Sequence, residues 1–279
     1  NGGILALQGT NKRGFPIYFI TDDNTVSAAT TNTTLVQPGG SLRLNLSGSS
    51  TFLKNKLAIW DGGWVYKGHQ EFAGKSITLK DTSNIIDHAT HVAGTMLAKG
   101  KYPPAKGMAF NASTLSSYDF NNDIAEMSAA APNLLLSNHS YGEMGGWVFD
   151  DGANRWEWFG IPGDTVDYTF GFYGDHAQNY DKIAYNAPYY TIVEAAGNAR
   201  GSTGPAIGDD YYGYASPSDQ TFVDKGPRPA GISSNDGYDN ISSTANAKNI
   251  ITVGSVNPLP NGPSNSQSIA VSYFSSWGP

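Results

Sequence analysis

A chain of 279 residues is long enough for one large α/β domain, which would bury roughly 75% of the surface of the unfolded chain. Hydrophobic residues make up 39% of the chain and charged residues only 15%, which is typical of a folded, loop-rich protein and excludes a disordered one. The net charge of −7 without a basic cluster argues against nucleic acid as a partner. No apolar run is long enough to span a membrane. The absence of cysteine excludes disulfides and thiolate metal sites.

The first 50 residues are polar and rich in Thr and Gly, and they predict an arm packed on the outside of a larger domain. A flexible leader is the alternative. The run from Phe15 to Thr21 contains Pro16 and therefore predicts an edge strand. Apolar and polar residues alternate from Ser41 to Leu46, which predicts a second short strand. We expect the main domain to cover residues 51–279.

The run from Leu57 to Gly63 is apolar and ends in an acidic residue followed by two glycines. This pattern predicts a buried parallel strand that leads into a tight loop. Residues just past the carboxyl ends of such strands line the functional crevice of α/β sheets, so Asp61 is a candidate site residue. The alternative is that Asp61 only forms the turn before the two glycines.

The segment from Asp87 to Met96 carries His88 and His91 among small and apolar residues. It predicts the first turns of a buried helix, with the two imidazoles on neighbouring faces. Because an unperturbed histidine titrates near neutrality, proton transfer is expected here if another residue holds the ring.

A strand, a helix and another strand are predicted in turn between residues 112 and 142, and further strands at 191–198 and 249–256. This alternation is typical of an α/β fold with a mostly parallel sheet. Residues 143–176 form a long insertion rich in aromatic and acidic residues. We expect short β-structure there, which walls a cleft or caps the sheet edge. We expect residues 201–245 to form a second long, irregular region.

Several segments in a fixed order resemble those of the subtilisin-like serine proteases, the subtilases or peptidase family S8. Leu57 to Gly63 resembles the aspartate motif of the family, and His88 to Thr95 is similar to its His-Gly-Thr-His-Val-Ala-Gly-Thr motif. Ala195 to Asn198 resembles its Ala-Ala-Gly-Asn turn, and Ser140-Tyr141-Gly142 its Ser-x-Gly strand on the substrate groove. The resemblance implies a subtilisin-like three-layer α/β fold, in which helices flank a mostly parallel central sheet, and a serine endopeptidase activity. The long aromatic-rich insertions of this sequence would be additions to that fold.

The resemblance also implies a role for each matching residue. Asp61 would orient the imidazole, His88 would act as the general base, and the amide of Asn198 would stabilise the oxyanion. Ser140, Tyr141 and Gly142 would bind an extended polypeptide substrate by strand addition. His91, the second histidine of the motif, is expected to be a buried structural neighbour.

The nucleophile of the family lies in a Gly-Thr-Ser-Met-Ala segment, and no Gly-Thr-Ser occurs in residues 1–279. We therefore expect a chain cut before its serine and inactive by itself. A non-catalytic, peptide-binding homologue is the alternative. A metal hydrolase that uses His88, His91 and Asp61 is a third hypothesis, but zinc-binding histidine pairs on helices are usually four apart with a glutamate between them.

The chemistry of the family requires no cofactor, but its members often bind Ca²⁺ as a structural ion. Glu71 lies where a calcium ligand is commonly found, although a lone surface carboxylate is usually only solvated. The expected partners are a polypeptide substrate and the protein's own propeptide or a missing C-terminal segment. The first 50 residues would then belong to a propeptide junction. The family resemblance favours a bacterial-type protein that is secreted or held at the cell envelope.

Overall fold

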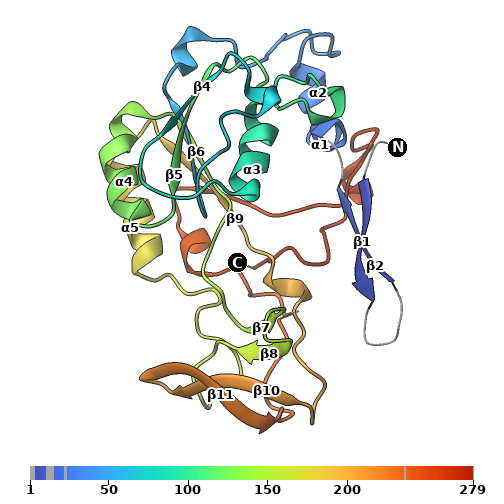
Figure 1. Ribbon diagram of the computed structural model, residues 1–279, viewed down its shortest axis with the longest axis vertical. Helices are drawn as coiled ribbons and strands as arrows, with labels where there is room; N and C mark the ends of the chain where they lie inside the picture. Colours follow the sequence, from blue (N-terminus) through green and yellow to red (C-terminus); the bar gives the residue numbers. More distant parts are fainter. Residues whose placement is uncertain (1–3, 11–15, 22–23, 236, 279) are drawn as a thin grey trace. The chain divides into compact units, whose positions relative to one another are not determined.

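The computed structural model describes residues 4–10, 16–21, 24–235 and 237–278. These residues divide into two compact units. The first unit comprises Asn1–Phe120 with Asn257–Ala270, and the second comprises Asn121–Val256 with Val271–Pro279. Both units contain parallel strands and helices, which confirms the predicted α/β class (Figure 1).

The first unit is organised around the strand that ends in Asp61. This strand, β3 (Leu57–Asp61), pairs in parallel with β5 (Thr114–Asp119), which in turn pairs in parallel with β4 (Ser76–Leu79). All five residues of β3 are buried, as expected for a strand inside a parallel sheet that is covered on both faces. The predicted buried strand is therefore confirmed.

The predicted histidine helix is also confirmed, as α3 (Asp87–Leu97). Its buried residues are Ala89, Ala93 and Leu97, which are spaced by four and therefore share one face of the helix. This face packs against the sheet in an apolar cluster with Leu57, Ile59, Ile77 and Leu115. Small alanines on the buried face allow the helix to approach the sheet closely.

The N-terminal residues of the first unit form β1 (Ile4–Thr10) and β2 (Pro16–Thr21), which pair antiparallel, followed by α1 (Asn24–Thr30) and α2 (Thr33–Val36). The predicted strand before Thr21 is thus confirmed, although Phe15 lies outside the described residues. The amide of Gln37 donates to the carbonyl oxygen of Met108 at 2.9 Å, so residues beyond α2 contact the segment that follows α3. The boundary expected after residue 50 stays a prediction.

The strand predicted at Ser41–Leu46 is wrong. Arg43 and Asn45 both have φ 55°, a left-handed backbone that cannot continue a strand ladder. Leu42, Leu44 and Leu46 are each more than half exposed. The alternation of apolar and polar residues therefore forms no strand here, and neither set of side chains is buried.

In the second unit, β9 (Thr191–Ala195) lies between β12 (Ile251–Val253) and β6 (Leu136–His139), and both pairings are parallel. The helices α4 (Asp123–Ala130) and α5 (Asp175–Asn186) lie side by side (Figure 1). No helix in the described part of the chain is long and apolar enough to cross a membrane.

The two long insertions together form one mixed β-sheet in the second unit. Its strands are β7 (Trp147–Asp150), β8 (Arg155–Trp158), β10 (Asp210–Ser216) and β11 (Asp219–Pro227). The β-structure predicted within residues 143–176 is confirmed. The irregular structure predicted for residues 201–245 is wrong for β10 and β11, because β10 pairs with β11 and also, in parallel, with β8. Trp147, Trp158 and Ile232 form the apolar core of this part.

Candidate active site

The first unit brings Asp61 and His88 into direct contact. Asp61 ends β3, and His88 lies in the first turn of α3. The Nδ1 atom of His88 lies 2.8 Å from Oδ1 and 2.9 Å from Oδ2 of Asp61. The carboxylate is buried, with 3% of the side chain exposed, whereas the imidazole is 57% exposed. A carboxylate that accepts from Nδ1–H leaves the Nε2 atom of the ring as a proton acceptor.

The carboxylate of Asp61 has a further donor, because Oδ1 also accepts from the backbone N–H of Gly62 at 2.8 Å. This bond fixes the carboxylate at the end of the strand and directs it toward the helix. Asp61 is therefore more than a turn former. The backbone packs closely just after Asp61, since a Cβ on Gly63 would come within 2.4 Å of the carbonyl oxygen of Asn84.

His91 is exposed, so the expectation that it is a buried neighbour is wrong. The buried face of α3 carries Ala89 and Ala93, and His91 lies two positions from each of them. At 100° per residue, two positions place a side chain on the opposite side of a helix. Within the described residues, no three His, Cys, Asp or Glu side chains gather in a way that could hold a metal ion.

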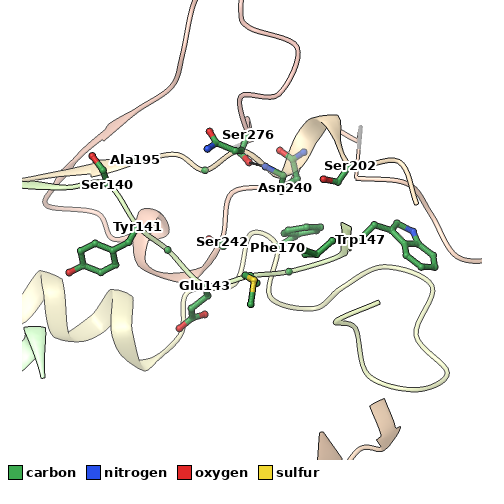
Figure 2. Close-up of a pocket in the computed structure, with 17 residues that line it drawn as sticks. Ser140, Tyr141, Glu143, Trp147, Phe170, Ala195, Ser202, Asn240, Ser242 and Ser276 are labelled. Atoms are coloured by element: carbon green, nitrogen blue, oxygen red, sulfur yellow. Dashed lines mark hydrogen bonds between the residues drawn. The ribbon is translucent and has the colours of Figure 1, made fainter. Parts of the chain in front are cut away.

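The second unit contains a pocket of about 330 Å³ that brings together the other predicted site residues. Ser140, Tyr141 and Gly142, which follow β6, line it together with Asn198, which follows β9. Figure 2 shows Ser140 and Ala195 on neighbouring segments at one end of the pocket, and Phe170 and Trp147 toward the other. Parallel strands place both segments at the same edge of the sheet.

A turn held by Ser276 presents Asn198 to this pocket. The N–H of Ser276 donates to the carbonyl oxygen of Gly197 at 2.9 Å, and its Oγ accepts from the N–H of Ala199 at 3.2 Å. Gly197 has φ 101°, and a Cβ there would come within 3.1 Å of the Ser276 hydroxyl. The turn therefore requires glycine at residue 197. The role of Ser276 was not predicted, because its partners lie almost 80 residues away.

The model of the subtilase family matches residues 25–279. The chain belongs to the subtilase family. No curated protein matches its sequence. The α/β fold and the order of the matching motifs agree with this membership, and the family resemblance read from the sequence is confirmed.

Solved structures of several proteases are similar to this subtilase at low sequence identity. The CspB protease of Clostridium perfringens is 13% identical with a TM-score of 0.48, over 90% of this chain and 76% of that chain. The prenylagaramide maturation protease PagA is 15% identical with a TM-score of 0.41, over 81% of this chain and 59% of that chain. The self-cleaved protease domain of PatA is 18% identical with a TM-score of 0.39, over 84% of this chain and 64% of that chain. The chain thus spans less than two thirds of the length of PagA and of the PatA domain.

A buried polar network supports the pocket wall of this subtilase. The hydroxyl of Tyr141 donates to Asp123 Oδ2 at 2.7 Å, and the Nδ1 atom of His139 lies 2.9 Å from the same hydroxyl. The Nε2 atom of His139 is 2.6 Å from the hydroxyl of Ser137. Burial lowers the pKa of His139 to about 3, so the ring is neutral at physiological pH. A neutral ring serves here as a bridge between two hydroxyls, and the network anchors Tyr141 from behind.

Burial also shifts the pKa values of other groups in this network. It raises the pKa of Tyr141, and the neighbouring Tyr180 and Asp123 act in the same direction. It raises the pKa of Glu194 well above its usual value, and the hydroxyl of Thr244 donates to Glu194 Oε1 at 3.1 Å. Glu194 lies on β9, the strand that leads to Asn198.

Glu71 is not a solvated surface carboxylate, since only 3% of the residue is exposed. Its Oε2 accepts from the N–H groups of Gly100 at 2.7 Å and Lys101 at 2.9 Å, and its Oε1 accepts from the N–H of Tyr102 at 2.7 Å. These donors take up most of the acceptor capacity of the carboxylate. The side chain thus binds the loop after α3 directly.

Proposed function

We propose that this subtilase is a serine endopeptidase that hydrolyses polypeptides by acyl transfer. The observation that carries the proposal is the pair formed by the buried carboxylate of Asp61 and the exposed imidazole of His88, joined through Nδ1. A serine hydroxyl becomes a nucleophile when a histidine takes its proton, and an acid that holds the histidine fixes the required tautomer.

In the proposed reaction, Nε2 of His88 takes the proton of the serine hydroxyl as that oxygen attacks the peptide carbonyl. The negative charge of Asp61 stabilises the imidazolium that forms. His88 then gives the proton to the leaving amine, and water repeats the sequence on the acyl-enzyme. The side-chain amide of Asn198 donates to the carbonyl oxygen as it becomes negative.

The substrate would bind as an extended strand against Ser140, Tyr141 and Gly142, through its backbone. These residues continue β6 beyond its last paired residue, His139. The buried network behind Tyr141 keeps the segment in place. A rigid segment lowers the entropy that peptide binding costs.

We propose that a segment outside residues 1–279 supplies the nucleophile, since these residues contain no Gly-Thr-Ser. We propose that residues 1–279 are inactive without it. Reading the gene beyond the codon for Pro279 tests this point: a Gly-Thr-Ser-Met-like continuation supports the enzyme. A protein encoded without such a segment would instead be a peptide-binding homologue.

The proposal is tested with the full-length gene product and a fluorophosphonate, which reacts covalently with an activated serine. We expect labelling and peptidase activity in the wild type, and neither of them in His88→Ala. His91→Ala is the matched control, because His91 is on the same helix, is exposed and has no proposed role in the chemistry. Loss of labelling in folded His91→Ala with full labelling in His88→Ala would refute the assignment.

No cofactor is required by this mechanism. A structural Ca²⁺ ion remains our proposal, and dialysis against a chelator followed by thermal unfolding tests it. Secretion, or attachment to the cell envelope, is likewise proposed from the family, and cell fractionation tests it.

A further inference from the structure

Two cavities in the second unit have a wall in common. The first is the pocket of about 330 Å³ that contains Ser140 and Asn198. The second, of about 210 Å³, is lined by Trp158, Val166 and Tyr238 among others. Phe170 and Asn240 line both cavities. Whatever separates the two spaces therefore includes these two side chains.

Asn240 is fixed in its place. Only 2% of the residue is exposed, its amide donates to the carbonyl oxygen of Asn235, and its Oδ1 accepts from the N–H of Trp277 at 2.9 Å. Removing this side chain would leave buried backbone groups without partners. Asn240 is thus part of the framework and does not adjust to a ligand.

Phe170 is held by packing alone, since a phenyl ring forms no conventional hydrogen bond. Its ring lies against the glycine pair that follows the substrate segment: a Cβ on Gly145 would come within 3.1 Å of Phe170 Cε1, and a Cβ on Gly146 within 2.8 Å of Cε2. The ring occupies space that only glycine leaves open. The ring lines the pocket on the side away from Ser140, and Trp147 lies beyond it (Figure 2).

Much of the remaining lining suits an apolar side chain, although Ser202 and Ser242 add hydroxyl groups to it. Met144, Val148 and Trp147 contribute apolar surface to its lining. Glu143 also lines it, but its Oε1 lies 2.8 Å from Nδ1 of His176 and is engaged there. The proposed function places the scissile carbonyl at Asn198, which lines the same pocket. The side chain of the residue that supplies this carbonyl therefore enters the pocket.

We propose that Phe170 sets the depth of this pocket and thereby the size of the side chain that the enzyme accepts before the scissile bond. With the ring in place, the pocket accepts Leu better than Trp. Without the ring, the pocket and the second cavity join, and a large aromatic side chain extends into both. This inference rests on the proposed function.

The size of the effect follows from the apolar surface involved. One methylene more or less in an apolar pocket changes kcat/KM about 10- to 200-fold. The wild-type pocket would exclude an indole and the Phe170→Ala pocket would bury it. The apolar surface that is buried then differs by that of several methylene groups. We therefore expect Phe170→Ala to raise the ratio of kcat/KM for Trp over Leu at least about 10-fold.

The experiment uses the full-length gene product and peptides that differ only in the residue before the scissile bond, with Ala, Leu, Phe and Trp. Phe170→Ala and the milder Phe170→Leu are compared with the wild type, and kcat and KM are determined separately. Phe172→Ala is the matched control, because Phe172 is half exposed and lines neither cavity. We expect a changed preference in the two Phe170 variants, larger for Ala than for Leu, and none in the control.

An unchanged preference in an active Phe170 variant would overturn the inference and leave the proposed function intact. A folded Phe170→Ala that cleaves none of the peptides would also overturn it, because Phe170 would then affect catalysis and not size selection. If Phe170→Ala does not fold, the Phe170→Leu preference decides. A folded wild type that cleaves no peptide would refute the proposed function, and the inference with it.

Discussion

Glu71→Gln tests how the first unit holds the loop after α3. The substitution keeps the shape of the side chain but removes its charge and turns one acceptor oxygen into an NH₂ donor. If the remaining oxygen keeps the bonds from Gly100 and Lys101, the new NH₂ group faces the N–H of Tyr102. Two donors then point at each other, and one bond is lost outright.

The expected loss follows from these bonds. A hydrogen bond to a charged group contributes about 1.5–3 kcal/mol to stability, and a neutral one about 0.5–1.5 kcal/mol. One charged bond is lost and two become neutral, while water partly replaces them because the loop is only partly buried. We expect the free energy of unfolding to fall by about 2–4 kcal/mol at neutral pH.

The loss should depend on pH. Burial by itself raises the pKa of Glu71, but the N–H groups of Tyr102, Lys101 and Gly100 outweigh it, and the folded-state pKa lies below the usual 4.5. A lowered folded-state pKa stabilises the protein above the pKa of the unfolded chain, and this contribution disappears as the pH falls through the folded-state value. The difference between wild type and Glu71→Gln should be full at neutral pH and shrink below about pH 4.5.

Urea unfolding, followed by tryptophan fluorescence at several pH values, measures this difference. Hydrogen exchange at Gly100, Lys101 and Tyr102 reports on the loop itself and should accelerate in the variant. Asp151→Asn is the control, because Asp151 is an exposed acid and its loss should change stability little. Equal stability of wild type and Glu71→Gln at neutral pH, or a difference that does not vary with pH, would refute the reasoning.

The remaining predictions concern the proposed chemistry in the full-length protein. Asp61→Asn should keep the fold but lower kcat about 10⁴-fold, because Nδ1 of His88 loses the acceptor that sets its tautomer; unchanged kcat would contradict the role of Asp61. Asn198→Ala should lower kcat about 10²- to 10³-fold, the cost measured for such a donor in subtilisin, with little change in KM. Ser276→Ala removes the acceptor of the Ala199 N–H and should lower kcat about 5- to 30-fold, with partial recovery in Ser276→Thr; equal kinetics of the three forms would show that the turn does not need the hydroxyl.

Short stretches of sequence were sufficient for the parts of the fold that depend on local pattern. The strand that ends at Asp61 was predictable, since an apolar run before Gly62 and Gly63 leaves few alternatives to a buried strand and a turn. The helix with His88 was predictable from two histidines three apart that are followed by small and apolar residues. The roles of Asp61 and Asn198 came from the order of the motifs, because each of these two motifs alone was compatible with a purely structural interpretation.

Contacts between distant residues account for what the sequence did not reveal. Glu71 binds N–H groups 29 to 31 positions away, and β8 pairs with β10 across more than 50 residues. Neither partner carries a local signal of the other, because a backbone N–H has no sequence signature.

The strand predicted from the alternation of Leu42, Leu44 and Leu46 failed for the same reason. A period of two forms a strand only where a neighbouring strand supplies hydrogen bonds and a surface to cover. Phe170 was one aromatic residue among many in its insertion, and packing against Gly145 and Gly146 is what places its ring between two cavities.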